Sequence, residues 1–421
     1  QTVSQTPAQL GGALLNDGNG NQWALVFSGK LDARKLGTKG DGATYDSKAI
    51  QAAINAVEPF NGTVFCAATS SFYLLEASNV AKSWPLLPSG ALSASTACLI
   101  IPRGVALTGE KGTHLRCEDG TLSLIILDNG TDASITNMRI SNNYTVTGGA
   151  GHGILQLTDG LDENVKNLEL SKLMIEDVGS YGIGLQYGRH ENVSIKNVTT
   201  LNTGSDGIDT KARQSSGGDD ISNIIENFRS FNAGLRFPSG GIAGADIRGQ
   251  WNINNVYCQL SVDGSTGLRL RPSDGTANNV AKRTNVNNIT VETPSNSTTS
   301  TKGLSLQGRE CNVSNINVDN CNTSLEFQGS GGGELAYNMN IANFTSTNAR
   351  EYGIDSTVSA SNISFVNTTI TDMAATATAM IRVEGDNFNF VNTTYDNSIS
   401  TVYSVSSGAN PTINRSNDSP T

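Results

Sequence analysis

One phrase recurs along the chain from about residue 130 onward. It consists of a glycine, a short run of alternating apolar and polar residues, a polar turn, and a segment of the form Asn-Ile/Val-x-Ile/Val. The first runs read "GILQL" (from Gly153), "GIGLQ" (Gly182), "GIDTK" (Gly207), "GADIR" (Gly244), "GLRLR" (Gly267), "GLSLQ" (Gly303), "SLEFQ" (Ser324) and "GIDST" (Gly353). The interval varies from roughly 20 to 37 residues. This variation indicates stacked coils with turn insertions rather than repeats of fixed length.

Each copy holds two or three short strands, with asparagine at the turns and no helix between them. The pattern predicts an all-β fold, a right-handed single-stranded parallel β-helix whose coils stack about 4.8 Å apart. A β-propeller would instead need antiparallel blades with tight hairpins. Asn-X-Ser/Thr triplets recur at one place in the repeat, so we interpret them as turn positions. We expect the following side chains to point inward: Ile183, Leu185, Ile208, Thr210, Ala245, Ile247, Leu268, Leu270, Leu304, Leu306, Leu325 and Phe327.

One segment near the start, "DSKAIQAAINAVE", has a helical period, and we expect it to form an N-terminal capping helix. We expect four parts in the chain. Residues 1–40 form a leading strand and neck segment, 41–130 the capping helix and first coils, 131–400 the main β-helix, and 401–421 a C-terminal tail. The chain opens on Gln1, so we expect a processed or truncated piece of a longer protein.

The net charge of −10 and the pI of about 4.9 argue against a nucleic-acid partner. No apolar run approaches the roughly 18 residues that a membrane span needs. The six cysteines form no Cys-x-x-Cys pair, so we predict no zinc site and no other metal or cofactor. Free buried thiols and one or two disulfides both remain open.

Alternation along the strands sends the third and fifth residues of each run outward, where we expect them to face solvent. The third positions read Gly184, Asp209, Asp246, Arg269, Ser305 and Glu326, and the fifth positions read Gln186, Lys211, Arg248, Arg271, Gln307 and Gln328. Three consecutive coils therefore place acids beside bases, with uncharged coils on either side. Asp206 lies at the edge of the same strand as Asp209. This grouping indicates either a functional site or a lattice of surface ion pairs.

Two neighbouring carboxylates suit glycoside hydrolysis, in which one protonates the leaving oxygen and the other activates water or attacks carbon. We therefore predict that Asp206, Asp209 and Asp246 are catalytic, with Glu326 held in reserve as the acid. The bases would bind an anionic sugar or stabilise developing charge. The predicted substrate-binding residues are Lys211, Arg248, Arg269, Arg271, Trp251, Tyr181 and Tyr187. Stacking on sugar rings and buried packing are both open for the three aromatic residues.

The segment "LNTGSDGIDT" resembles the "NTDGID" strand of polygalacturonases, which are inverting pectin hydrolases on a parallel β-helix. On that pattern Asp206 takes the place of the catalytic first aspartate. The segment "GLRLRP" at Gly267 is similar to the substrate-binding strand of the same family, which places Arg269 and Arg271 against the substrate. The "GHG" motif of this chain lies upstream, so the resemblance assigns no role to His152.

Residues 16–56, "NDGNGNQWALVFSGKLDARKLGTKGDGATYDSKAIQAAINA", resemble the start of the β-helix in bacteriophage tailspike depolymerases. That resemblance implies a homotrimer on the virion tail that cuts a bacterial surface polysaccharide, capsule or lipopolysaccharide O-chain. Two other functions stay open. A polysaccharide lyase could hold Ca²⁺ on the three aspartates and abstract a proton beside a uronate. A non-catalytic adhesin would bind sugar without cutting it.

Overall fold

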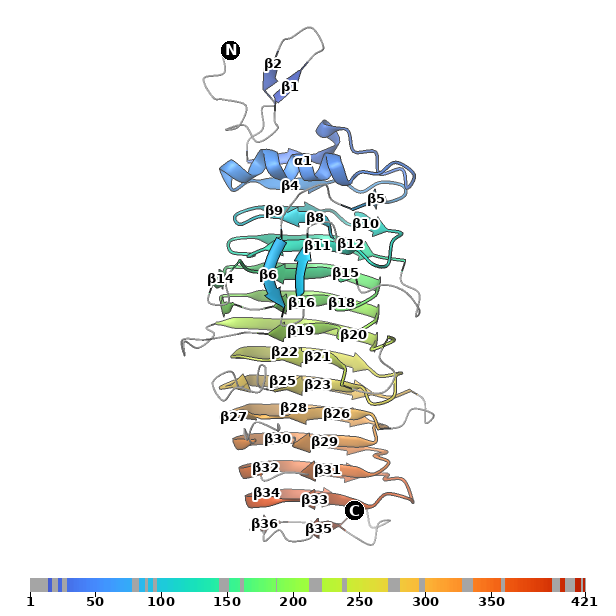
Figure 1. The fold of residues 1–421 in the computed structure, drawn as a ribbon. Coiled ribbons are helices and arrows are strands. Elements are labelled where there is room, and N and C mark those ends of the chain that lie inside the picture. The colour runs from blue at the N-terminus through green and yellow to red at the C-terminus, as the bar shows by residue number, and fades with distance from the viewer. Residues whose placement is uncertain are drawn as a thin grey trace. The chain divides into compact units, whose positions relative to one another are not determined.

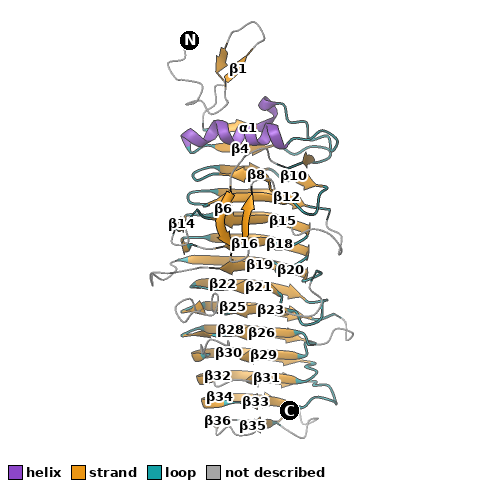
Figure 2. Cartoon of the chain, viewed as in Figure 1, coloured by secondary structure: helices purple, strands orange, loops and turns teal. Residues whose placement is uncertain are grey.

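The computed structural model divides the chain into two compact units, residues 1–198 and 199–421. The structure describes residues 14–16, 22–24, 29–77, 83–87, 90–93, 97–143, 151–159, 163–186, 188–211, 222–236, 241–271, 281–294, 300–327, 336–356, 360–395, 402–405, 413–417 and 419–420. Strands predominate in both units, as Figure 2 shows by colour. No helix among the described residues is long and apolar enough to cross a membrane.

The elements of the first unit are β1 (Leu14–Asn16), β2 (Gln22–Ala24), β3 (Lys30–Asp32), η2 (Ala33–Leu36), α1 (Ser47–Val57), η3 (Glu58–Phe60), β4 (Thr63–Cys66), β5 (Tyr73–Leu75), β6 (Ser83–Leu87), β7 (Gly90–Ser93), β8 (Ala97–Ile101), β9 (Ala106–Gly109), β10 (His114–Cys117), β11 (Ser123–Asp128), β12 (Ser134–Ser141), β13 (Ile154–Leu157), β14 (Asn164–Lys166), β15 (Glu169–Val178), β16 (Ile183–Gln186) and β17 (Arg189–Glu191). Strand β18 (Ser194–Thr203) contains the boundary between the units. Strands β8, β11, β13 and β16 pair in parallel in that order, and β5, β10, β12 and β15 form a second parallel set.

The expected helix is confirmed as α1, which lies next to β4 (Figure 1). It buries Ile50, Ala53, Ile54 and Val57 on one face. The side-chain amide of Gln51 donates to the Ile100 carbonyl at 2.9 Å and accepts from the Ile100 N–H at 2.8 Å. Ile100 lies on β8, the last strand of its sheet. The helix therefore satisfies backbone groups that an open sheet edge would leave unpaired.

The elements of the second unit are β19 (Ile208–Lys211), β20 (Asn223–Ala233), β21 (Ala243–Ile247), β22 (Trp251–Gln259), β23 (Thr266–Leu270), β24 (Ala281–Lys282), β25 (Asn285–Glu292), β26 (Lys302–Leu306), β27 (Gly308–Arg309), β28 (Asn312–Asp319), β29 (Thr323–Phe327), β30 (Tyr337–Thr347), β31 (Tyr352–Ser356), β32 (Ala360–Thr371), β33 (Ala379–Val383), β34 (Gly385–Tyr395), β35 (Tyr403–Val405), β36 (Ile413–Ser416) and β37 (Ser419–Pro420). Strands β19, β21, β23, β26, β29, β31, β33 and β35 pair in parallel and are called the short-strand sheet here. Strands β20, β22, β25, β28, β30, β32, β34 and β36 form the long-strand sheet. The expected class, an all-β parallel β-helix, is confirmed.

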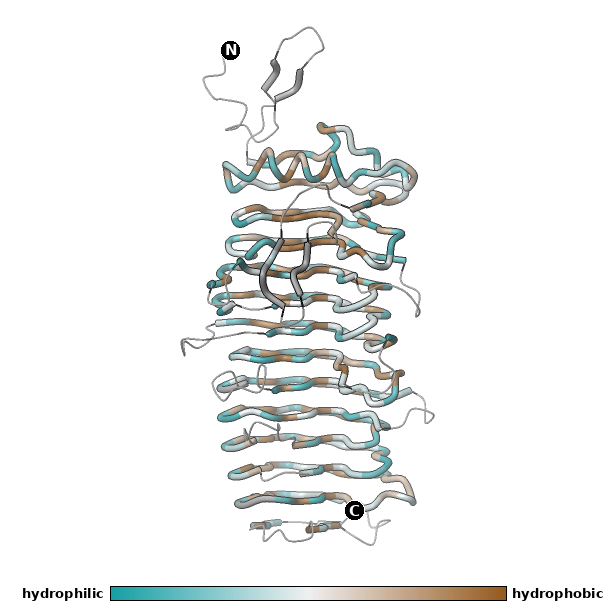
Figure 3. The backbone as a smooth tube through the Cα atoms, viewed as in Figure 1, coloured by the Kyte–Doolittle hydropathy of each residue, from teal (hydrophilic) through white to brown (hydrophobic). Residues whose placement is uncertain are grey.

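The core of the second unit is a stack of equivalent side chains from successive strands. Ile208, Ala245, Leu268, Leu304 and Leu325 are register partners in that order, and all are buried. The alternation of apolar and polar residues that puts them inside is visible along the strands in Figure 3. The inward positions expected for this unit are thus confirmed, including the polar one. Thr210 is buried there because its hydroxyl accepts from the Arg248 N–H at 2.9 Å and donates to the Arg248 carbonyl at 3.2 Å.

Asparagines bend the long strands at intervals of five residues. In β30 and just beyond it, Asn338, Asn343 and Asn348 have φ values of 52°, 52° and 54°. This left-handed conformation favours asparagine and glycine. The side chains also form ladders between coils, since the Asn343 amide donates to Asn315 at 2.8 Å and accepts from Asn367 at 3.0 Å. Asn343 begins the triplet Asn343-Phe344-Thr345, so the turn interpretation of the Asn-X-Ser/Thr triplets is confirmed at this position.

Candidate active site

The outward residues of the short-strand sheet form the column that the alternation predicts. The register partners in order are Asp209, Asp246, Arg269, Ser305 and Glu326. Asp209 and Asp246 thus lie on adjacent strands, β19 and β21, at one strand spacing of about 4.8 Å. Two carboxylates at this spacing repel each other unless cations lie between them.

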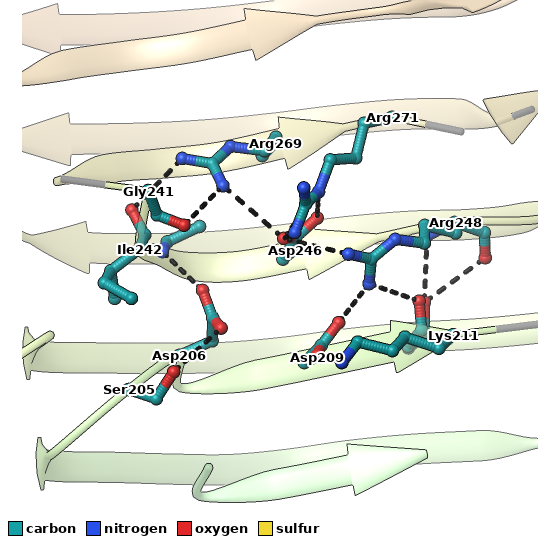
Figure 4. A network of polar contacts seen from close by, with 12 residues as sticks. Ser205, Asp206, Asp209, Lys211, Gly241, Ile242, Asp246, Arg248, Arg269 and Arg271 are labelled. Atoms are coloured by element: carbon teal, nitrogen blue, oxygen red, sulfur yellow. Dashed lines mark hydrogen bonds and ion pairs between the residues drawn. The ribbon is translucent and has the colours of Figure 1, made fainter. Parts of the chain in front are cut away.

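Four cations, Lys211, Arg248, Arg269 and Arg271, supply that compensation (Figure 4). The Arg248 guanidinium hydrogen-bonds to Asp209, and its second nitrogen lies 3.6 Å from Asp246. Arg271 Nε lies 3.0 and 2.8 Å from the two oxygens of Asp246. Lys211 Nζ lies 3.3 Å from Asp209. Each aspartate therefore has its own cation on one side and shares Arg248 on the other.

Arg269 closes the network at the far side of Asp246. Its guanidinium lies 3.5 Å from the Asp246 carboxylate and donates to the Gly241 carbonyl at 2.7 Å. A weaker contact of 3.4 Å reaches the Ile242 carbonyl. The side chain therefore lies along the sheet rather than extending away from it.

Asp206 lies just before β19 and bonds to neutral groups instead of cations. Its carboxylate accepts from the Ala243 N–H at 2.5 Å and from the Ser205 hydroxyl at 3.2 Å. Gly207, the residue between the acids, has no room for a side chain. A Cβ there would come within 2.4 Å of the Gly244 carbonyl oxygen. The close approach of the two coils therefore requires glycine, and it brings Asp206 up to the backbone of the next coil.

The three carboxyl groups are buried, with exposures of 4% for Asp206, 1% for Asp209 and 0% for Asp246. The expectation that they face solvent is wrong, because the alternation gives the side of the sheet but not what lies over it. The side chains of Arg271 and Lys211 are 37% and 22% exposed. Cations therefore lie between the carboxylates of Asp209 and Asp246 and the solvent.

The pKa values of Asp206 and Asp209 are shifted in opposite directions. Burial, reinforced by the charges of Asp246 and Asp209, raises the pKa of Asp206 to about 7. Burial also acts to raise the pKa of Asp209, but the charges of Arg248 and Lys211 outweigh it and hold this pKa below its ordinary value. Near neutral pH, Asp206 exchanges its proton while Asp209 stays ionised.

Of the three aromatic residues predicted to bind sugar, the structure describes Trp251 and Tyr181. Trp251 is buried at the start of β22, with its indole N–H donating to the Arg248 carbonyl at 2.9 Å. The prediction that Trp251 stacks on substrate is therefore wrong. Tyr181, in the first unit, stacks on His152 at a centroid distance of 5.0 Å. Tyr187 lies outside the described residues.

Glu326, the reserve acid, belongs to a second charged cluster on the same sheet. Its register partner on β31 is Asp355, which pairs with Arg382 of β33, while Lys302 of β26 pairs with Glu326 itself. The site residues predicted from the sequence did not include Asp355, Arg382 or Lys302. The third position of "GIDST" was the available signal for Asp355.

The residues of this site do not suit a calcium ion. The oxygens that Asp209 and Asp246 would offer already contact Arg248 and Arg271, and an added cation would be repelled by them. Among the described residues no group of three or more His, Cys, Asp or Glu is arranged to hold a metal ion. All six cysteines are free and buried, so the free-thiol alternative is confirmed and the disulfide alternative is wrong.

The fold defines the chain as a parallel β-helix protein, and solved structures share it. The mannuronan C-5 epimerase A-module of Azotobacter vinelandii aligns with a TM-score of 0.59 and 14% identity over 93% of this chain and 99% of that one. The N-terminal fragment of bacteriophage Phi29 gene product 12 aligns with a TM-score of 0.62 and 16% identity over 93% of this chain and 66% of that one. The tailspike of Escherichia coli bacteriophage HK620, solved with a pentasaccharide, aligns with a TM-score of 0.54 and 10% identity over 99% of this chain and 72% of that one.

These likenesses confirm the expected tailspike-type parallel β-helix as a fold. At such identities they carry no residue of the site from one protein to another. No protein-family model and no curated protein sequence matches the chain.

Proposed function

We propose that the chain is a tailspike-type depolymerase that hydrolyses glycosidic bonds in a bacterial surface polysaccharide, capsule or lipopolysaccharide O-chain. The observation that carries the proposal is the unequal surroundings of two carboxyl groups three residues apart. Asp206 bonds to neutral groups, whereas Asp209 contacts Arg248 and Lys211, and this difference shifts their pKa values in opposite directions. Neighbouring acids with separated pKa values are the arrangement that acid–base cleavage of a glycosidic bond requires. The similar folds of two phage proteins agree with it.

In this mechanism Asp206, which holds its proton up to about pH 7, donates it to the leaving glycosidic oxygen. Asp209 is ionised and either activates water or attacks the anomeric carbon. Asp246 is a positioning residue, since its contacts with Arg271 and Arg248 fix the guanidinium groups.

Access to Asp209 and Asp246 runs through the cations that pair with them. Arg271 is the most exposed member of the network and holds the fully buried Asp246. A carboxylate on the substrate competes with Asp246 for the Arg271 guanidinium, and that competition opens the site. A neutral polymer has no group that could replace Asp246. The proposed substrate therefore carries acidic sugars.

The proposal includes the assembly and location that the tailspike resemblance implies, a homotrimer on a virion tail. Light scattering at micromolar concentration tests the assembly directly. A stable 44.2 kDa monomer would contradict it.

The activity is tested on a panel of purified capsular polysaccharides and O-chains, with released fragments identified by mass spectrometry. We expect Asp206→Asn to lower turnover by at least about 100-fold. The matched control is Glu310→Gln, which removes a carboxylate from an exposed pair with Arg283 and should leave turnover unchanged. Fragments with an unsaturated, ultraviolet-absorbing end would contradict hydrolysis and show that the protein is a lyase. Polymer bound but uncut by the wild-type chain would identify an adhesin.

A further inference from the structure

A second set of buried acids and partly exposed cations lies farther along the short-strand sheet. Glu326 and Asp355 are register partners on β29 and β31, with exposures of 6% and 4%. Lys302 Nζ lies 2.6 Å from Glu326, which also accepts from the Ser305 hydroxyl at 3.3 Å. Two carboxylates at one strand spacing thus recur in this cluster.

Arg382, one of the two cations of this cluster, is held in place by a carboxylate and an aromatic side chain. Its Nε and Nη2 donate to the two oxygens of Asp355 at 2.6 and 2.7 Å, which is a bidentate pair. Its Nη1 donates to the Tyr352 hydroxyl at 2.9 Å, and the guanidinium lies 4.2 Å from the Tyr352 ring centroid. The nearby acid Glu351 is engaged by the Asn322 amide at 2.6 Å. Arg382 is therefore held in place before any ligand arrives.

The layering in both clusters gives the sheet a basic outer surface. The side chains of Lys302 and Arg382 are each 27% exposed, while the acids they pair with lie underneath. The chain as a whole carries a net charge of −10, so a cationic surface runs against its composition. Charge of this sign attracts an anionic ligand.

An unsatisfied donor lies between the two clusters. Gln307 follows β26, and its backbone N–H donates to the Leu270 carbonyl, which places it one coil along from Arg271. Its side-chain nitrogen is buried and has no hydrogen-bond partner among the residues that the structure describes. A hydroxyl or carboxylate oxygen of a ligand supplies the acceptor that this amide lacks.

We infer that Lys302 and Arg382 form a second anion-binding subsite, so that the sheet binds two acidic sugars of one polysaccharide chain. The inference rests on the proposed function and specifies its substrate as a polymer with acidic sugars at intervals. In register, Asp246 is followed by Arg269, Ser305, Glu326 and Asp355. Glu326 and Asp355 therefore lie about 14 and 19 Å along the sheet from Asp246 at the usual strand spacing.

The test uses calorimetric binding of oligogalacturonates and oligomannuronates of increasing length to the full chain carrying Asp206→Asn. The affinity should rise in one step, by at least about tenfold, at the length that first spans both clusters. Maltooligosaccharides, which are neutral, should show no step. Raised salt should shrink the step, because it screens exposed charges.

The double variant Asp355→Asn/Arg382→Gln removes a surface cation together with its buried partner, so it leaves no unpaired buried charge. Lys302→Gln/Glu326→Gln does the same for the other pair. Both should abolish the step and leave the binding of short oligomers unchanged. The control Arg283→Gln/Glu310→Gln, an exposed pair, should keep the step.

The subsite is overturned if both double variants keep the step, if they weaken all lengths equally, or if no acidic oligomer binds. The outcomes also separate this inference from the hydrolase proposal. If the double variants lose the affinity step but the wild-type chain cleaves no polysaccharide, the subsite is retained and the hydrolase proposal is rejected. If the wild-type chain cleaves a polysaccharide but shows no affinity step, the hydrolase proposal is retained and the subsite is rejected.

Discussion

Asp209 and Asp246 are register partners on adjacent parallel strands, and the Arg248 guanidinium contacts both carboxylates. All three side chains are buried. The shared cation makes the two strands electrostatically dependent on each other, because removing either acid leaves a buried guanidinium with too few partners. The site therefore carries stability as well as the chemistry proposed for it.

Asp209→Asn should lower the free energy of unfolding by about 3 kcal/mol, since it removes the hydrogen-bonded partner of the buried Arg248. Thermal melts measure the loss. Glu310→Gln, which breaks an exposed pair with Arg283, should cost less than about 1 kcal/mol. Equal melting temperatures for the two variants would contradict a buried role for the Asp209–Arg248 pair.

Asp206 should make stability fall as pH rises. Its folded pKa of about 7 lies above the ordinary 3.8, so its contribution is fully present below about pH 3.8 and is lost as pH passes through 7. Asn at this position stays neutral. The melting temperature of wild type relative to Asp206→Asn should therefore decrease between pH 5 and pH 8. A pH-independent difference would show that Asp206 is ionised throughout this range.

Asn343→Ala should destabilise the second unit by about 2 kcal/mol, because alanine resists the left-handed conformation and both ladder bonds are lost. Asn343→Gly tolerates the conformation and loses only the bonds, so denaturant unfolding should place it between wild type and the alanine variant. If Asn343→Gly is as unstable as Asn343→Ala, the loss of the ladder hydrogen bonds accounts for the whole effect, and the backbone conformation contributes nothing.

Leu268→Asp should prevent soluble folding, since it places an unpaired charge in the fully buried stack. Val366→Asp is the matched control, because Val366 is 38% exposed on β32 and a charge there stays hydrated. Soluble yield and far-ultraviolet circular dichroism compare the two. A soluble, folded Leu268→Asp chain would refute the inward register of β23.

The period of two along each strand was enough to predict the column from Asp209 to Glu326 and the inward stack behind it. It could not predict burial, because the cations that cover the acids come from long side chains whose conformations the pattern does not specify. Trp251 shows the same limit, since the chain turns between Arg248 and the start of β22 and sends the indole inward. Asp355 was within reach of the pattern, and extending the column by one coil would have predicted it.

The pairing of Gln51 with both peptide groups of Ile100 also bears on aggregation. A parallel sheet whose last strand offers free peptide groups is a template for amyloid-like growth. Here a single amide side chain occupies the place that an incoming strand would take at β8. Replacing Gln51 would therefore do more than loosen α1, because it would uncover a seeding surface on the first unit.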